Sequence, residues 1–267
     1  MPLWRSARVT EHLLTGATIA LAFESARRLG LRVDRLPRVV RWWHARLCHI
    51  LDMRIETTGH PSRGCLFVAN HVSWLDIPII GAQSPVGFLS KAEIRRWPLV
   101  GWMASIAGTL FLPRGANQVG KMIGIIEKRL RNGHGVVVFP EGTTTDGTRL
   151  LRFHPRLFAV GQCAGIRVQP VAIRFGTNSS PDPNAPFIGD DAFLPHLANV
   201  ISKPGMRVQL HFLPPLDGAE LSRREIAEYC GSQIAAVLEI EQVPASLPLG
   251  ADHASEQYAS PPEAMVH

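Results

Sequence analysis

Residues Cys65-Leu66-Phe67-Val68-Ala69-Asn70-His71-Val72-Ser73-Trp74-Leu75-Asp76 contain the transition around which the chain is organised. The apolar run 65–69 has the length and the Val/Phe content of a short buried strand. Ser73 occupies the position of a helix N-cap, and the apolar residues 74–80 continue as a helix. The stretch therefore predicts a buried strand that turns directly into a helix.

His71 lies in this turn, five residues before Asp76. A carboxylate that accepts one ring N–H of a neutral His fixes its tautomer and stabilises the imidazolium. Such a His can take a proton from an alcohol near neutral pH, as a general base. The alternative is a structural turn His and a surface Asp, because a His and an Asp five residues apart occur by chance in many chains.

The composition favours one sizeable core, because the chain has 267 residues and 46% hydrophobic residues. From residue 65 onward, apolar strand patterns alternate with helical ones. This alternation predicts an α/β fold: a single layered domain with a mixed, largely parallel sheet flanked by helices. Strands are expected at 65–69, 86–90, 109–112, 135–139, 168–174 and 206–213. Helices are expected at 73–82, 95–107, 117–131, 155–164 and, after a capping box at Ser222, to about residue 240.

The N-terminal segment carries most of the net charge of +6: residues 1–60 hold ten Arg and five acidic residues. Its apolar run Leu13–Phe23 spans roughly 16 Å as a helix, about half of a bilayer core. Apolar residues at helical spacing in 36–51 predict a helix that packs on the domain, or an interfacial helix with Trp42 or Trp43 at the depth of lipid headgroups, and the two do not exclude each other. We expect membrane-associating helices at 1–58, with a signal peptide as a weaker interpretation of the first run. The main α/β domain would then span 59–242, followed by a disordered tail at 243–267.

Two further strand ends carry polar residues. The run 136–139 leads into Pro140-Glu141-Gly142-Thr143, so Glu141 is displayed at the edge of the sheet, to hold substrate or to brace the site loops. Strand 109–112 ends near Arg114, whose guanidinium fits a phosphate or carboxylate. Lys91 is a similar cation at a strand end. The four Cys residues lack CxxC spacing and the His residues lack ligand spacing, so no metal site, no disulfide framework and a reducing compartment are expected.

Four blocks together resemble the glycerolipid acyltransferases of the 1-acyl-sn-glycerol-3-phosphate acyltransferase type. Residues 70–76 match the NHxSxxD block, which contains the HX4D motif, and 108–114 match GxxFxxR. Residues 139–143 match FPEGT, and 168–173 match VxPVAI. The blocks occur in the family's order over about residues 60–175.

The resemblance implies an O-acyltransferase that moves an acyl group from acyl carrier protein or coenzyme A to a lysolipid hydroxyl. His71 would be the catalytic base and Asp76 its partner, with no cofactor beyond the acyl thioester. Arg114 would bind the acceptor's phosphate, and the loop of Glu141, Gly142 and Thr143 would belong to the acceptor site. Lys91 and Ser73 complete the candidate substrate-binding residues.

The acceptor expected first is 1-acyl-sn-glycerol-3-phosphate (lysophosphatidic acid), giving phosphatidic acid in phospholipid biosynthesis. The family usually continues FPEGT with Arg-Ser, whereas this chain has Thr144-Thr145-Asp146-Gly147. That version resembles the branch with lyso-ornithine-lipid acyltransferases, whose acceptor has no phosphate. A non-catalytic peripheral membrane protein is an alternative of another class, and nucleic-acid binding is disfavoured because no reading module is present. The expected location is the cytoplasmic face of the inner membrane.

Overall fold

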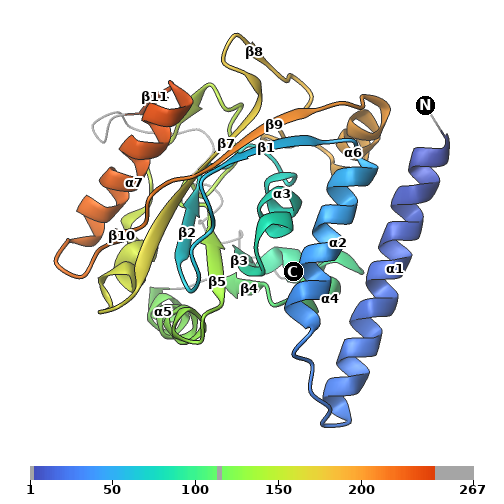
Figure 1. Ribbon diagram of the computed structural model, residues 1–267, viewed down its shortest axis with the longest axis horizontal. Coiled ribbons are helices and arrows are strands. Elements are labelled where there is room, and N and C mark those ends of the chain that lie inside the picture. Colours follow the sequence, from blue (N-terminus) through green and yellow to red (C-terminus); the bar gives the residue numbers. More distant parts are fainter. Residues whose placement is uncertain (1–2, 113–115, 244–267) are drawn as a thin grey trace, which may run out of the picture.

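The main sheet of the protein follows a path of seven strands (Figure 1). The structure is a computed structural model, which describes residues 3–112 and 116–243, without the side chains of 116–119. The strand order is β1-β9-β7-β2-β5-β3-β4. Strands β2 (Leu66–Ala69), β5 (Gly135–Val138), β3 (Val86–Lys91) and β4 (Leu110–Leu112) are mutually parallel. β7 (Arg167–Thr177) is parallel to β2 but antiparallel to β9 (Arg207–Phe212), which pairs in parallel with β1 (Arg54–Thr58). The expected mixed, largely parallel sheet is therefore confirmed.

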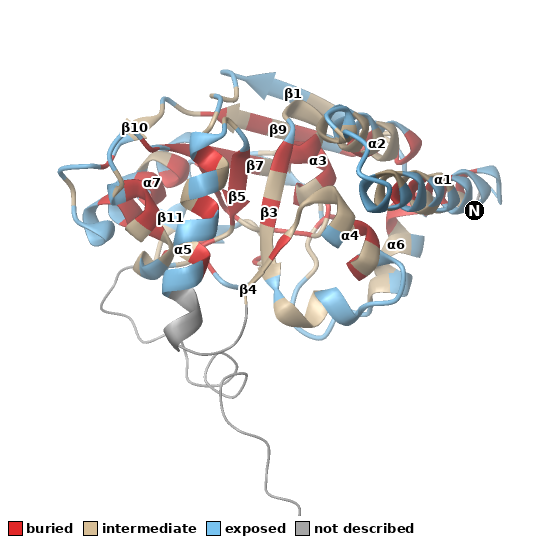
Figure 2. Ribbon diagram, turned by 90° about the horizontal axis from the view of Figure 1, so that it is seen from below, coloured by how far each residue is buried: buried red, intermediate tan, exposed pale blue. Residues whose placement is uncertain are grey.

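Helices cover both faces of this sheet (Figure 1). One face carries α2 (Leu36–Ile50), α3 (Asp76–Gln83) and α6 (Phe193–Ser202), and the other carries α5 (Ala116–Arg131), α7 (Arg223–Leu238) and the 3-10 helix η2 (Pro155–Gln162). Successive residues of β2 point to opposite cores: Phe67 packs with the first group and Val68 with the second. Burial on both sides explains why the central strands are continuous apolar runs (Figure 2).

The remaining elements are short or peripheral. The N-terminal helix is α1 (Leu3–Arg28), and the 3-10 helix η1 (Ala92–Arg96) precedes α4 (Val100–Ala107). Two-residue strands are β6 (Arg149–Leu150), β8 (Ser180–Pro181), β10 (Leu216–Asp217) and β11 (Glu241–Gln242). β8 and β10 pair with β7, and β11 pairs with β6.

Several expected helices differ in detail from the structure. The helix expected at 73–82 begins at Asp76, and its N-cap is Leu75, so the assignment of Ser73 as N-cap is wrong. The helix expected at 95–107 is split into η1 and α4, because Pro98 and the left-handed Leu99 interrupt it. The segment expected as a helix at 155–164 is 3-10 rather than α-helical. The capping box at Ser222 and the end of α5 before Gly133 are confirmed.

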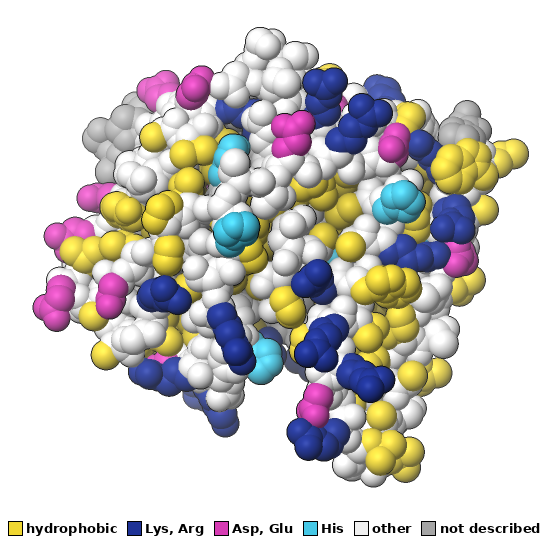
Figure 3. Space-filling model, in the orientation of Figure 1, with side chains coloured by type: hydrophobic (Ala, Val, Ile, Leu, Met, Phe, Trp, Pro, Cys, Tyr) yellow, Lys and Arg dark blue, Asp and Glu magenta, His cyan; other side chains and the backbone are white. Residues whose placement is uncertain are grey.

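The N-terminal helices α1 and α2 pack against each other and against the domain. Trp43 faces inward, where it stacks on His12 at 4.3 Å and donates a hydrogen bond from Nε1 to the His12 carbonyl at 3.2 Å. Trp42 is 50% exposed and therefore holds the outward position. Hydrophobic and basic side chains are interspersed over this flank (Figure 3). Among the described helices, none has the length and apolarity required to cross a bilayer. The tail from residue 244 lies outside the described residues.

Candidate active site

The register of the sheet places the two informative loops side by side. Val68 of β2 pairs with Val138 of β5, and the strands are parallel. His71 and Glu141 each follow three residues later, so they emerge next to one another at the carboxyl ends of the strands. The backbone N–H of His71 accordingly donates to Glu141 Oε1 at 2.7 Å. Ligand sites in open α/β sheets form at such carboxyl ends.

His71 and Asp76 form the pair that the sequence predicts. His71 Nδ1 lies 2.7 Å from Asp76 Oδ2. The Asp76 side chain is completely buried, whereas that of His71 is 20% exposed. Because a carboxylate only accepts hydrogen bonds, the proton resides on Nδ1 and leaves Nε2 as the basic nitrogen. Nε2 has no hydrogen-bond partner among the described residues, so it is free to face a substrate hydroxyl.

Asp76 also holds the turn that carries His71. Its Oδ2 atom accepts from the backbone N–H groups of Val72 at 2.8 Å and Ser73 at 3.0 Å. These two amides are therefore committed to the carboxylate and do not stabilise an oxyanion. The Ser73 hydroxyl is buried and has no partner within the described part of the chain, so Ser73 does not present its side chain to a substrate.

Glu141 braces two loops through its carboxylate. Oε1 accepts from His71 N, and Oε2 accepts from Leu151 N at 3.0 Å. Burial raises the pKa of Glu141 to about 8, with a smaller contribution from the charge of Asp76, while the two backbone donors act in the opposite direction. Of the two roles considered for Glu141, bracing is the one for which the geometry provides contacts.

Two neighbours fix the position of the His71 ring and backbone. The Phe139 ring stacks on the imidazole with centroids 4.0 Å apart and an interplanar angle of 15°. Thr145 N donates to the His71 carbonyl at 2.9 Å. Asp146, the next residue, is exposed, and its Oδ1 atom accepts two hydrogen bonds from Thr148: one from the backbone N–H at 2.9 Å and one from the hydroxyl at 2.6 Å. The Thr-Thr-Asp-Gly loop, residues 144–147, thus lies directly against the turn that carries His71.

Three other candidate residues lie at the same edge of the sheet. Gly142, with φ of +76°, and Thr143 are exposed beyond Glu141. Lys91 is exposed at the end of β3, and the registers of β2, β5 and β3 make it level with Asn70. It is two strands away from β2, which corresponds to about 10 Å at the usual strand spacing. Arg114 lies outside the described residues.

An aromatic cluster that includes Trp74, in the turn that follows His71, was not predicted from the sequence. Trp74 packs edge-on against Phe193 of α6 at 5.2 Å, and Phe193 packs against Trp97 at 6.0 Å. Trp74 Nε1 donates to His196 Nδ1 at 3.0 Å, and His196 Nε2 donates to the Pro186 carbonyl at 2.9 Å. The segments that hold Trp74, Trp97 and residues 186–196 are distant in sequence. Their aromatic residues are therefore the only feature of the sequence that could have indicated this cluster.

Potential metal ligands and cysteine thiols complete the description of the part of the chain that the structure covers. No group of three His, Cys, Asp or Glu side chains there is arranged to hold a metal ion. The four Cys residues are free thiols, and burial raises the pKa of Cys48 and Cys230 to about 12.

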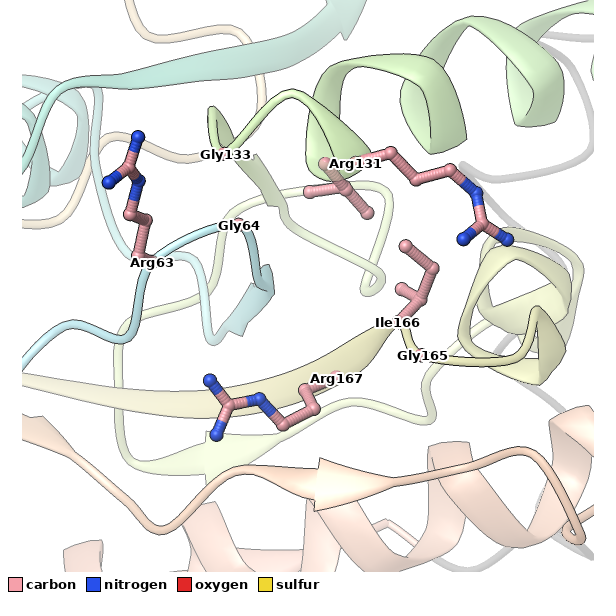
Figure 4. A pocket seen from close by; sticks show the side chains of 8 residues that line it. Arg63, Gly64, Arg131, Gly133, Gly165, Ile166 and Arg167 are labelled. Carbon is pink, nitrogen blue, oxygen red and sulfur yellow. The ribbon is translucent and has the colours of Figure 1, made fainter.

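A hollow of about 440 Å³ lined by Arg63, Arg131 and Arg167 lies at the amino ends of β2 and β7 (Figure 4). His71 follows the carboxyl end of β2, so this hollow lies at the opposite edge of the sheet.

Comparisons with known proteins agree with this geometry. A family model described as Acyltransferase matches residues 51–174. A lyso-ornithine lipid O-acyltransferase from Pseudomonas aeruginosa is 44% identical over 228 residues, which cover 84% of this chain and 88% of the relative. The chain belongs to the acyltransferase family.

Other relatives of this acyltransferase are named for a different acceptor. A 1-acyl-sn-glycerol-3-phosphate acyltransferase from Neisseria gonorrhoeae is 34% identical over 65% of this chain and 70% of the relative. The crystal structure of the 1-acyl-sn-glycerophosphate acyltransferase PlsC from Thermotoga maritima superimposes with a TM-score of 0.60 at 24% identity. It covers 88% of this chain and 96% of that chain, and it supports the same α/β fold. These relatives, like the family model, are all named as acyltransferases.

Proposed function

We propose that the enzyme transfers a fatty acyl group from an acyl thioester to the free hydroxyl of a lyso-ornithine lipid. The observation that carries the chemistry is the His71–Asp76 pair, with Nδ1 held at 2.7 Å and Nε2 open at the carboxyl ends of the strands. The choice of acceptor is supported by relatives named lyso-ornithine lipid O-acyltransferases, which align with 76–84% of the chain at 32–44% identity. 1-Acyl-sn-glycerol-3-phosphate is the second candidate, supported by relatives that align with 65% of the chain.

In the proposed reaction, the acceptor hydroxyl donates a hydrogen bond to His71 Nε2. His71 takes this proton as the hydroxyl oxygen attacks the thioester carbonyl, and Asp76 stabilises the imidazolium that forms. The tetrahedral intermediate then collapses with cleavage of the C–S bond, and the imidazolium returns the proton to the leaving thiolate. A thioester is already activated, so the reaction needs no covalent acyl-enzyme and no cofactor other than acyl carrier protein or coenzyme A as donor carrier.

The acceptor headgroup would lie over the loops that follow β5, β3 and β4. Arg114, Lys91, Gly142 and Thr143 are the proposed contacts, while Glu141 would act by holding the His71 backbone. Asp146, in the residues that follow Thr143, adds a carboxylate to this region. An ornithine headgroup carries an ammonium group that this carboxylate can attract, whereas a glycerol phosphate does not.

The membrane surface is the proposed location of the enzyme, on the cytoplasmic face of the inner membrane. Arg35, Arg38 and Trp42 line a shallow hollow of about 410 Å³ on the outer side of α2. A Trp flanked by Arg side chains suits the depth of anionic headgroups. In this arrangement α1 and α2 lie along one leaflet.

An acceptor panel tests the activity and the headgroup together. Purified enzyme would be incubated with one radiolabelled acyl thioester, carried either by acyl carrier protein or by coenzyme A, and with lyso-ornithine lipid or 1-acyl-sn-glycerol-3-phosphate. We expect labelled diacyl product with lyso-ornithine lipid at the higher kcat/KM. Higher kcat/KM with the phosphate acceptor would reverse the order of the two candidates. Vesicle binding without product from either acceptor would favour a non-catalytic membrane protein.

A further inference from the structure

The segment Arg95-Arg96-Trp97-Pro98-Leu99-Val100, which we call the 95–100 rim, is exposed at all six positions. Trp97 and Leu99 are each 40% exposed and Val100 is 37% exposed. Four consecutive exposed apolar residues directly after two exposed arginines are unusual for a surface that meets only water, because apolar side chains in contact with each other are normally buried.

The shape of the rim is imposed by the backbone and is not a frayed end. Leu99 has a φ of +61°, a conformation that L-residues with large side chains rarely adopt. Gly101 is buried, and a side chain there would collide with the carbonyl oxygens of Ile94 and Arg95. The close packing of Gly101 against η1 and the left-handed Leu99 together turn the apolar side chains outward. Strain of this kind is maintained where it serves a function.

The rim is connected to the catalytic turn and to the N-terminal helices. Trp97 contacts Phe193, which contacts Trp74, three residues after His71. In the other direction, Trp102 of α4 donates from Nε1 to Glu24 Oε2 of α1 at 3.0 Å. α4 lies on the same flank as α1 and α2 (Figures 1 and 2). The segment that carries the exposed apolar residues therefore leads into a helix that contacts α1 and α2, and Trp97 is linked through Phe193 to the turn that follows His71.

We propose that the 95–100 rim is a second membrane contact, which inserts Trp97, Leu99 and Val100 into an anionic lipid surface beside the active site. Charge complementarity selects this occupant: Arg95 and Arg96 would lie at the level of anionic headgroups while the next four residues enter the acyl boundary. The inference extends the proposed function, because an acceptor whose chain stays in the leaflet then meets His71 without leaving the lipid.

Vesicle flotation of the full chain tests the contact without any turnover. The variant Leu99→Gly/Val100→Asp removes the apolar groups but suits the local backbone, since Gly adopts a positive φ without strain and Asp suits the first turn of α4. We expect its partition onto phosphatidylglycerol-containing vesicles to fall at least about tenfold. Val237→Asp is the matched control, because Val237 on α7 is also 37% exposed and should leave binding unchanged.

The charged residues provide an independent arm. Arg95→Gln/Arg96→Gln should weaken binding to phosphatidylglycerol vesicles by up to about 30-fold, from ~1 kcal/mol per basic residue near the surface. Binding to pure phosphatidylcholine vesicles should change little. Wild-type affinity in both rim variants, or an equal loss in Val237→Asp, would overturn the proposal. A dimer that becomes a monomer in the rim variants, by light scattering, would assign the rim to a second copy of the chain instead.

Turnover distinguishes failure of the rim from failure of the proposed function. Rim variants should lose activity on a lysolipid embedded in vesicles but keep wild-type kcat/KM on the same lysolipid in detergent micelles. Equal losses in vesicles and micelles would contradict a membrane role. If wild-type enzyme acylates neither acceptor but the rim variants still lose vesicle binding, the rim assignment holds and the proposed function fails.

Discussion

Replacement of Asp76 by Asn isolates the contribution of one buried charge to catalysis. Oδ2 accepts all three hydrogen bonds of this side chain, from His71 Nδ1, Val72 N and Ser73 N, while Oδ1 has no partner among the described residues. An Asn whose carbonyl oxygen replaces Oδ2 keeps all three donors, and its NH₂ group occupies the position of Oδ1. The substitution therefore keeps an acceptor for His71, Val72 and Ser73, and it removes the negative charge while it places an amide NH₂ at the buried position of Oδ1.

The size of the effect follows from that charge. A charged hydrogen-bond partner contributes about 1.5–3 kcal/mol, and a unit charge pair at about 4 Å contributes about 4 kcal/mol at an effective dielectric constant of 20. A loss of roughly 3–4 kcal/mol from the imidazolium-like transition state lowers kcat about 10²–10³-fold. The KM for the acceptor should change little, because the neutral His71 of the ground state keeps its hydrogen bond.

The assay is the initial rate of labelled diacyl-lipid formation at saturating acceptor, with circular dichroism to verify the fold. Asp217→Asn is the matched control, since Asp217 is exposed and its Oδ1 likewise accepts a backbone hydrogen bond, from Ala219 N at 3.1 Å. It should keep kcat within about twofold of wild type. A folded Asp76→Asn enzyme with more than a tenth of wild-type kcat would refute the assignment of Asp76 as the stabiliser of the imidazolium.

Three further substitutions test other parts of the site. His71→Ala should abolish acyl transfer with folding retained, and substantial residual turnover would end its assignment as general base. In wild type, the pKa of Glu141 is raised to about 8, so between about pH 4.5 and 8 the folded state keeps a proton that the unfolded chain releases. The free energy of unfolding of wild type should therefore fall with rising pH in this range, by up to roughly 1.4 kcal/mol per pH unit. Glu141→Gln cannot titrate and should not show this decrease. Urea denaturation at pH 5, 6.5 and 8 measures this slope, and equal slopes in both proteins would contradict it. Arg114→Ala should raise the acceptor KM more than the thioester KM, whereas equal effects would indicate a structural arginine.

The central sheet was predictable because its strands are buried on both faces. Runs such as Leu66–Ala69 and Gly135–Val138 are apolar at nearly every position, and this pattern is typical of parallel strands between helices. Their alternation with helical segments then determines the fold class. β1 was missed for the opposite reason: Arg54–Thr58 is an exposed edge strand with no apolar pattern, and only its pairing with β9 defines it.

The pairing of His71 with Asp76 was predictable from the sequence, but most other contacts around it were not. Spacing alone suggested that Asp76 reaches His71, and the strand end before Glu141 suggested that this residue holds substrate or braces the site loops. The stacking of Phe139, the bracing by Glu141 and the aromatic contacts of Trp74 with Phe193 depend on how distant segments pack. Propensity describes neighbours in sequence, so it contains no information about such pairs.

The error at Ser73 shows how closely fold and chemistry are joined here. Sequence rules favour Ser as an N-cap, but in the structure the carboxylate of Asp76, the first residue of α3, accepts hydrogen bonds from the amides of Val72 and Ser73 in the preceding loop. The same oxygen that orients His71 therefore also sets where the helix begins. Asp76→Ala should consequently damage both stability and turnover, whereas Asp76→Asn should separate them. If both variants lose the same stability, the carboxylate charge and not its hydrogen-bond geometry would hold the turn.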